Sequence, residues 1–206
     1  MFFRKSMLKV KILIFRIACR LLGYQYRTAT TKEEVEKVYR LRDLVYREFS
    51  YEEGKTKDEF DEYSDYVFIE KNNEVVGAVR IIKNSFLGLP IEKFFNVKLN
   101  EGEYLRNVCE VSRLTIKSQY RGGLRLVGIG ILIGILEYLK NSNTKVVYFT
   151  SHSKIINSYR KLGIPIMKLA HKKDTDQNIL NKLNHRSYFS RHEVQPYVIK
   201  VNDIKI

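Results

Sequence analysis

Glu110 and Arg113 place an acid and a base three residues apart in the apolar, β-branched stretch CEVSRLTIK. Such a stretch predicts a strand, and side chains alternate along a strand, so we expect Glu110 and Ser112 to face one way and Arg113 the other. A carboxylate held in a site can accept a proton from an attacking group. Alternatively, Glu110 and Arg113 form a structural ion pair, because a buried charge needs a partner whatever the function.

A glycine-rich turn follows this strand at the point where a helix begins. The segment 119–123 reads QYRGG, and GIG follows at 128–130. The first turn of a helix presents unpaired backbone N–H groups to an anion, and glycines allow a close approach of the backbone. Arg121 and Arg125 add fixed positive charge at the same place. The turn is therefore a candidate anion-binding site.

The elements that must position these residues follow from periodicity and turn signals. The predicted order is a helix over 31–49, a hairpin of strands over 66–72 and 74–82, a loop and short helix within 84–95, a strand over 107–117, a helix over 128–143, a strand over 145–151, a helix over 152–163 and a last strand over 196–204. The acidic segment 50–65 is predicted to be a loop. This order predicts an α/β fold with a mixed central sheet flanked by helices and a strand–helix–strand crossover after the long strand.

The first 23 residues predict a basic amphipathic helix that ends near Gly23, and residues 24–206 predict a single domain. Four bases share one side of this helix, and an apolar set shares the other: Met7, Val10, Ile14, Ile17, Ala18 and Leu21. Charges interrupt the segment too often for a membrane-spanning helix. Two interpretations stand: the helix packs on the domain, or it makes peripheral contact with an anionic membrane on its inner, cytoplasmic face.

Charge and cysteine content narrow the class of protein. The net charge is +14, but residues 32–80 hold nine bases against fourteen acids, whereas residues 1–31 hold seven bases and no acid. An acidic middle between basic ends argues against nucleic-acid coating and suits an acidic partner or membrane. Two cysteines indicate no disulfide frame and a reducing, cytoplasmic compartment. The histidines show no zinc spacing, so we expect no metal.

The turn resembles the pyrophosphate-binding segment of the GNAT acyltransferase superfamily, usually Q/R-x-x-G-x-G/A. The spacing is longer here, so either Gly122 and Gly123 or Gly128 and Gly130 would form the cradle. NSYRKLGI is similar to the tyrosine-bearing helix of the same superfamily and puts Tyr159 where a general acid often lies. The resemblance implies the GNAT (acyl-CoA N-acyltransferase) fold.

A narrower resemblance covers roughly residues 35–165. The blocks LRDLVYREF, EFDEYSD, GAVRII, LPIEKFF and CEVSRLTI occur in the order found in acyl-homoserine-lactone synthases and long-chain N-acyl amino acid synthases. Ser64 is inserted in the acidic block, and the chain has no tryptophan, which the lactone synthases typically carry after the first arginine. The lack of tryptophan favours the N-acyl amino acid branch.

This resemblance implies transfer of an acyl group from a thioester to an amine, with the following roles. Glu110 accepts the amine proton, Ser112 hydrogen-bonds near the carbonyl and Tyr159 protonates the leaving sulfur. Backbone groups from Leu114 to Ile116, with Arg121 and the glycines, hold the pantetheine arm and phosphates. The remaining residues would bind the carboxylate and ammonium of the acceptor or brace the site by ion pairs: Arg42, Asp61, Asp65, Arg80 and Arg113.

The implied donor is acyl carrier protein with its phosphopantetheine, or acyl-CoA, and the acceptor is an amino acid. Acyl carrier protein is acidic, and residues 81–206 hold twenty-one bases against nine acids. Candidate docking residues are Lys168, Lys172, Lys173, Lys182, Arg186 and Arg191. The alternatives are a lactone synthase, a short-chain acetyl-CoA-dependent enzyme, and a non-enzymatic basic module that binds membrane or nucleic acid. An acyl tunnel between the central strands would separate long-chain from short-chain transfer.

Overall fold

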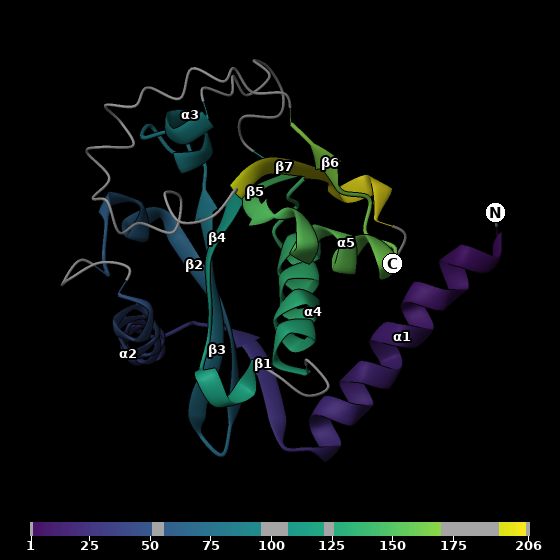
Figure 1. Ribbon diagram of the computed structural model, residues 1–206, viewed down its shortest axis with the longest axis horizontal. Coiled ribbons are helices and arrows are strands. Elements are labelled where there is room, and N and C mark those ends of the chain that lie inside the picture. Colours follow the sequence, from purple (N-terminus) through teal and green to yellow (C-terminus); the bar gives the residue numbers. More distant parts are fainter. Residues whose placement is uncertain (1, 51–55, 96–106, 122–125, 170–193, 205–206) are drawn as a thin grey trace.

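The computed structural model describes residues 2–50, 56–95, 107–121, 126–169 and 194–204, and its elements follow one another as in Figure 1. The helices are α1 (Phe2–Leu21), α2 (Lys32–Phe49), α3 (Pro90–Phe95), α4 (Leu126–Asn141) and α5 (Ser153–Lys161), with short 3-10 helices η1 (Glu59–Tyr63), η2 (Ser118–Tyr120) and η3 (Val201–Asp203). The strands are β1 (Tyr24–Thr28), β2 (Ser64–Lys71), β3 (Glu74–Lys83), β4 (Val108–Ile116), β5 (Val146–His152), β6 (Met167–Lys168) and β7 (Val194–Lys200).

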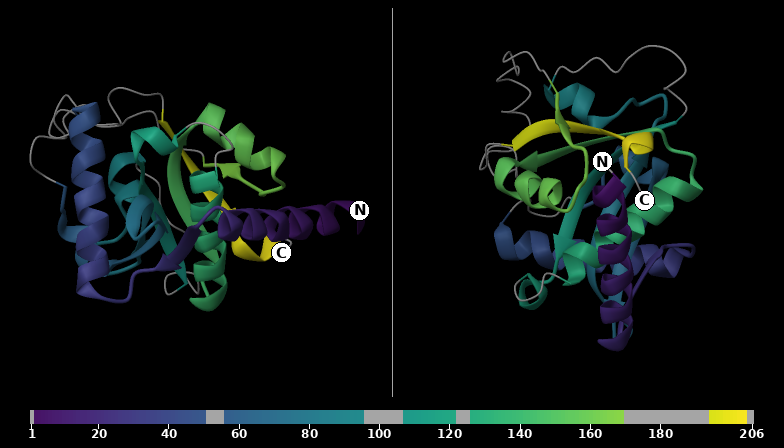
Figure 2. Two further views of the ribbon diagram at one scale, coloured as in Figure 1. Left: turned by 90° about the horizontal axis from the view of Figure 1, so that it is seen from below. Right: turned by 90° about the vertical axis from the view of Figure 1, so that its right-hand side faces the viewer.

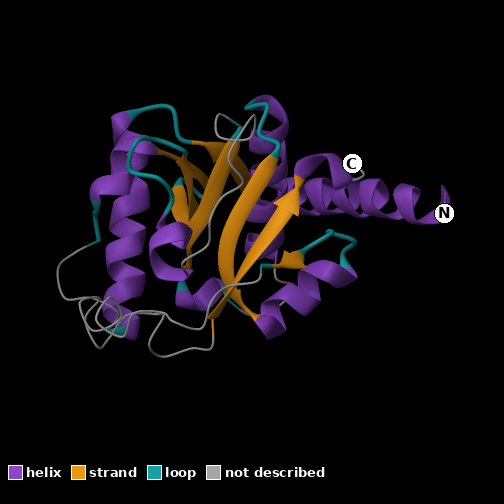
Figure 3. Cartoon of the chain, turned by 90° about the horizontal axis from the view of Figure 1, so that it is seen from above, coloured by secondary structure: helices purple, strands orange, loops and turns teal. Residues whose placement is uncertain are grey.

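One mixed sheet forms the centre of the domain. Its strand order is β1-β2-β3-β4-β5-β7-β6, and β4 and β5 are its only parallel neighbours among the described strands. Helix α4 makes the crossover between these two strands, as the sequence predicts. Figure 3 shows the sheet between α2 on one side and α4 and α1 on the other. The predicted mixed α/β architecture is confirmed.

The two faces of the sheet carry separate apolar cores. Alternate residues of β2, β3 and β4, such as Val67, Ile81 and Cys109, pack against α4. The intervening residues of the same strands pack against α2, as Phe68 does, or against α3, as Val108 does. Each strand position therefore assigns its side chain to the α4 face or to the α2–α3 face.

Helix α2 begins at a capping box. The hydroxyl of Thr31 accepts from the N–H of Glu34, and the Glu34 carboxylate accepts from the N–H groups of Thr30 and Thr31. This motif satisfies N–H groups that the first helical turn leaves unpaired. It fixes the start of the helix that carries Arg42.

Two strands lie where the sequence predicted no regular structure. Strand β1 follows Gly23, whose φ of 74° turns the chain out of α1, and it pairs with β2 as a sheet edge. Strand β6 has two residues and pairs with β7. A strand of two to five residues is too short to show a clear alternation in the sequence.

Helix α1 packs on the domain through α4 and projects beyond it toward the N-terminus (Figure 2). Cys19 is 1% exposed, and Ile12 packs beside Leu136 of α4 and Ile204. None of the described helices combines the length and the apolar composition that crossing a bilayer requires.

Strands β4 and β5 separate after a short parallel contact. Their pairing extends from Val108 and Val146 to Val111 and Phe149. Beyond that point β4 continues along β3 to Ile116, and β5 continues along β7 to His152. The backbone edge of β4 after Val111 therefore has no paired strand on its β5 side in the described part of the chain, and this interruption of the pairing is what we call the opening between β4 and β5.

Candidate functional site

Glu110 lies on β4 at the start of this opening and points to the α3 side of the sheet. It is 2% exposed, and its Oε2 accepts a 2.7 Å hydrogen bond from the N–H of Ile91 in α3. Burial raises the pKa of Glu110 from 4.5 to about 8, although the Ile91 hydrogen bond and the charge of Arg80 oppose this shift. A carboxyl group with this pKa can take up and release a proton near neutral pH.

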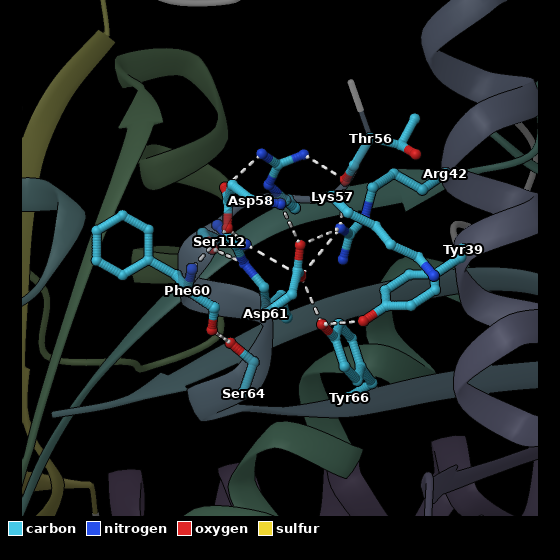
Figure 4. Close-up of polar contacts among 12 residues, drawn as sticks. Tyr39, Arg42, Thr56, Lys57, Asp58, Phe60, Asp61, Ser64, Tyr66 and Ser112 are labelled. Carbon is cyan, nitrogen blue, oxygen red and sulfur yellow. Dashed lines mark hydrogen bonds and ion pairs between the residues drawn. The ribbon is translucent and has the colours of Figure 1, made fainter. Parts of the chain in front are cut away.

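A buried network of charges lies beside Glu110. The guanidinium of Arg80 donates to Asp58 at 2.6 Å, to Asp61 at 3.1 Å and to the hydroxyl of Ser112 at 3.1 Å. Arg113 donates to the other oxygen of Asp58 at 2.6 Å. Figure 4 shows Asp58, Asp61 and Ser112 close together in this network. The network thus joins β3, β4 and η1, and it fixes Ser112 next to two arginines.

Arg42 anchors the far side of the network from α2. Its Nη1 donates to the carbonyl of Thr56 at 2.7 Å and to Asp61 at 3.1 Å, and the residue is 1% exposed. Burial opposes ionisation of Asp61, but Arg42 and Arg80 outweigh it and hold the pKa of Asp61 at about 2. The Asp61 carboxylate also accepts from the hydroxyl of Tyr66 at 2.5 Å. Arg42 and Asp61 therefore brace the network and expose little surface, which favours bracing over contact with the acceptor.

Asp58 is a member of the site that the sequence analysis missed. It caps η1, where its side chain accepts from Phe60 N–H and the Asp61 side chain accepts from Asp58 N–H. Its side chain is 23% exposed, against 6% for Asp61. The available signal was an Asp three residues before another Asp, which is a capping-box spacing within a segment predicted as a loop.

The predicted orientation of Arg113 is wrong. The pairing of β3 with β4 shifts between Ala78 and Arg80, because β4 has one more residue than β3 in this interval. The extra residue forms a bulge at Arg113, whose φ is 54°. A bulge interrupts the alternation of side chains. Arg113 and Ser112 consequently reach the same network. The ion pair considered between Glu110 and Arg113 is not formed, because Arg113 pairs with Asp58.

Asp65 does not join this network. It lies on the α4 face of β2, where it accepts from the hydroxyl of Tyr138 at 2.7 Å and pairs with Lys83 at 3.2 Å. The inserted Ser64 explains the difference, because an odd shift in a strand moves a side chain to the opposite face. The expected contact of Asp65 with the acceptor therefore has no geometric support.

Tyr159 lies on the opposite face of the sheet from Glu110. Its side chain packs in an apolar cluster of α5 with Ile156, Ile164 and Tyr197, and burial raises its pKa. The two groups would share a substrate only through the opening between β4 and β5. The role of Tyr159 as general acid stays a prediction.

The glycine turn is described only in part. Gly122 and Gly123 lie outside the described residues, and so do the proposed docking residues other than Lys168. Gly128 lies in the first turn of α4, and among the described residues a Cβ added to it would have no neighbour closer than Cδ1 of Ile116, at 3.9 Å. The described residues thus leave room beside Gly128, as a ligand-facing position requires.

Two predicted donor-binding residues also have structural partners, and their contact with a donor stays a prediction. A Cβ at Gly130 would lie 2.5 Å from Ile69 Cδ1, so this glycine serves close packing of α4 on the sheet. Arg121 donates to the carbonyl of Ile116 at 2.6 Å and to Glu48 at 2.8 Å. Leu114 is 46% exposed at the β4 edge, where a donor arm could reach its backbone.

Apolar side chains fill the space around Glu110 in the part of the chain that the structure describes. The cluster comprises Phe60, Ile82, Leu89, Ile91, Phe95, Val108, Val146, Tyr148 and Val198. A cavity of about 340 Å³ lies elsewhere, between the start of α2 and β2, with Thr31, Glu36 and Tyr66 in its lining. Glu110 therefore lies among buried apolar side chains, apart from this cavity.

Both cysteines are buried thiols, and burial raises the pKa of Cys109 to about 12. A thiol with this pKa is a poor nucleophile at neutral pH. Within the described ranges, His, Cys, Asp and Glu side chains form no group of three that could hold a metal ion.

The sequence of residues 41–129 matches the acetyltransferase (GNAT) domain family. Among curated proteins, no sequence matches the chain. Solved structures do resemble it. FeeM, an N-acyl amino acid synthase from uncultured soil microbes, has a TM-score of 0.63 and 14% identity over 87% of this chain and 91% of its own.

Two lactone synthases give similar values. The acyl-homoserine-lactone synthase LasI has a TM-score of 0.63 and 15% identity over 87% of this chain and 89% of its own. The CoA-dependent acyl-homoserine-lactone synthase BjaI was solved with S-adenosylmethionine and isopentyl-CoA. It has a TM-score of 0.64 and 13% identity over 87% of this chain and 84% of its own. The chain therefore has the GNAT fold, which it shares with N-acyl amino acid synthases and acyl-homoserine-lactone synthases, and its residues 41–129 are similar in sequence to the GNAT acetyltransferase domain.

Proposed function

We propose that the protein transfers a long-chain acyl group from acyl carrier protein or acyl-CoA to the amine of an amino acid or related small amine. The observation that carries this proposal is Glu110, a buried carboxyl group with a pKa of about 8 at the point where β4 and β5 separate. An N-acyl amino acid would be the product. The likeness to FeeM supports this product class.

Glu110 would act as the general base. An amine attacks a thioester only after it has lost its proton, and a base with a pKa near 8 can accept that proton at neutral pH. The new C–N bond forms as the C–S bond breaks, and the thiolate leaves with a proton, for which Tyr159 is the candidate donor. Ser112 and the backbone of Leu114 are candidates to stabilise the developing oxyanion.

The acceptor would bind where the charged network reaches the surface. Asp58 and Arg113 have side chains that are 23% and 15% exposed, whereas Arg80 is 3% exposed. The ammonium group of an amino acid suits Asp58, and its carboxylate suits the planar guanidinium of Arg113. Arg42 and Asp61 would hold these two residues in place without contacting the substrate.

The donor would lie along the edge of β4, with its phosphate at the turn into α4. The edge after Val111 no longer pairs with β5, and Gly128 lies in the first turn of α4, where the described residues leave room beside it. Acyl carrier protein as donor is supported by charge alone, since the chain carries +14 and an acidic partner would be attracted to it.

Short-chain transfer is the second candidate, and one observation favours it. The described side chains around Glu110 form a buried apolar cluster, and a long acyl chain would need room beside it. Long-chain transfer requires some of these side chains to move, whereas an acetyl group needs less room. Lactone synthesis has less support, because the chain has no tryptophan.

The test is product analysis with purified protein. Acetyl, medium-chain and long-chain thioesters of CoA and of acyl carrier protein are each incubated with mixed amino acids or with S-adenosylmethionine, and products are identified by mass spectrometry. We expect a long-chain N-acyl amino acid. In the Glu110→Gln variant we expect a loss of at least about 100-fold in kcat/KM, as for removal of a general base.

The exposed Ile155→Ala variant serves as a control and should keep full activity. An acetylated product alone would establish short-chain transfer, and a lactone would establish signal synthesis. No product from any donor, with salt-sensitive binding to DNA, would support a non-enzymatic module.

A further inference from the structure

Helix α1 has two apolar faces, and the described part of the chain covers only one of them. The covered face includes Ile12 and Phe15, which line a small apolar space with Leu132 and Leu136 of α4. The buried Cys19 continues this face one turn later. These contacts fix the rotation of the helix about its own axis.

The second face points away from the domain. Five apolar residues spaced as i, i+3, i+4, i+7 and i+11 form a continuous exposed stripe on it: Val10 (50% exposed), Leu13 (56%), Ile14 (58%), Ile17 (52%) and Leu21 (81%). Residues with this spacing share one side of an α-helix. An apolar stripe of this length on a projecting helix indicates a binding surface.

The positive charge of α1 indicates which kind of surface the stripe would bind. Residues 1–31 contain seven Lys or Arg and no acid, and six of the bases lie within α1: Arg4, Lys5, Lys9, Lys11, Arg16 and Arg20. By helical spacing, Arg16 and Arg20 run along one border of the stripe. A helix with an exposed apolar stripe, a basic border and no acidic residue is suited to the interface of an anionic bilayer.

We propose that α1 is a membrane anchor that lies in the surface of an anionic lipid bilayer through Val10, Leu13, Ile14, Ile17 and Leu21. The stripe inserts among the acyl chains, and the flanking bases contact lipid phosphates. The contact with α4 then holds the domain at the surface, with Arg16 paired to Glu137 at 2.5 Å. This inference does not depend on the acyl-transfer reaction.

Vesicle co-sedimentation tests the anchor with the full chain. We expect binding to vesicles of phosphatidylcholine with phosphatidylglycerol, at least tenfold weaker binding to phosphatidylcholine alone, and weakening by added salt. The double variant Ile14→Glu/Ile17→Glu should lose at least tenfold in binding to the anionic vesicles. The matched control Ile155→Glu puts one acid on a separate exposed apolar position in α5 and should bind nearly as wild type.

Thermal unfolding of the double variant should match the wild type, because both isoleucines are more than half exposed. Two results would overturn the proposal. One is failure of the wild-type protein to bind anionic vesicles. The other is a wild-type dimer, measured by sedimentation equilibrium without lipid, that the double variant converts to a monomer, since a second copy would then cover the stripe.

Discussion

At the scale of single residues, the buried carboxyl of Glu110 should leave a signature in the pH dependence of stability. Its pKa rises from 4.5 in the unfolded chain to about 8 in the folded protein. The unfolded chain therefore releases a proton above pH 4.5 that the folded protein keeps up to about pH 8. We expect the free energy of unfolding to fall across this interval, by about 1.4 kcal/mol per unit of pKa shift at most, and to level off above it.

Urea unfolding at a series of pH values measures this slope. The Glu110→Gln variant should lack it, because an amide does not titrate, and should be more stable than wild type above pH 8. Equal slopes in both proteins would mean that Glu110 ionises near its ordinary pKa and is not the tuned base proposed above.

The same ionisation should control the rate. If Glu110 must be unprotonated to accept the amine proton, kcat/KM should rise with pH up to about 8 and then level off. Rates measured at saturating donor and limiting amino acid give this profile. A flat profile between pH 6 and about pH 8 would contradict general-base catalysis by Glu110.

Asp61 should matter for folding far more than its neighbour in sequence, Asp65. Asp61→Asn leaves Arg42 and Arg80 buried with less countercharge, and the expected loss is about 3–5 kcal/mol in the free energy of unfolding. Asp65→Asn weakens a pair with the exposed Lys83 and should cost about 1 kcal/mol or less.

Denaturant unfolding of the two variants at neutral pH gives the comparison. Because the pKa of Asp61 is about 2 in the folded protein, its contribution to the free energy of unfolding is present above pH 3.8 and disappears as the pH falls toward 2. The free energy of unfolding of Asp61→Asn should therefore change less with pH between 3.8 and 2 than that of the wild type. Equal losses in the two variants would contradict the scaffold role assigned to Asp61.

At the scale of elements, α4 depends on glycines for its distance from the sheet. A Cβ at Gly134 would lie 2.6 Å from Cγ1 of Val67, a stiff and fully buried side chain. Gly134→Ala should therefore destabilise the protein by about 1–3 kcal/mol. Gly128→Ala meets nothing closer than 3.9 Å and should stabilise the helix by up to about 1 kcal/mol.

Thermal unfolding and donor affinity together test this pair. If Gly128 faces the donor phosphate, Gly128→Ala should unfold at a higher temperature and yet bind acyl-CoA more weakly, with a higher KM. A Gly128→Ala variant with unchanged KM would exclude this glycine from the cradle.

The elements show what the sequence can predict. The hairpin of β2 and β3, strand β4 and helix α4 were predicted because apolar periodicity over seven or more residues reports burial directly. Strand β1 was missed because five residues at a sheet edge are only partly buried. The split of apolar residues between two faces of α1 was also missed, since the sequence gives the spacing but not the surface that each face meets.

The residues of the site were predicted less completely, for reasons of geometry. Arg113 turns toward Ser112 because of a bulge, which depends on the register with β3 and leaves no pattern in β4 alone. Asp65 lies on the other face because one residue is inserted before it. Asp58 was missed because its partners, Arg80 and Arg113, come from distant parts of the chain.

At the scale of the whole molecule, net charge should decide which donor the enzyme prefers. The chain carries +14, and an acidic carrier protein would be attracted over its whole surface, whereas CoA presents its charge mainly at its phosphates. If acyl carrier protein is the donor, the KM for acyl carrier protein should rise steeply with salt between low and physiological ionic strength. The KM for acyl-CoA of the same chain length should change much less.

Charge reversal at a described position sharpens this comparison. Lys168 lies exposed on β6, at the far edge of the sheet from β1. Lys168→Glu should raise the KM for acyl carrier protein several-fold and leave both kcat and the KM for acyl-CoA unchanged, because a rim charge acts mainly on association. Lys37→Glu, on α2, changes the net charge equally and serves as the control. Equal effects of the two reversals would point to general attraction rather than a docking face at β6, and equal salt dependence for both donors would argue against a carrier protein as donor.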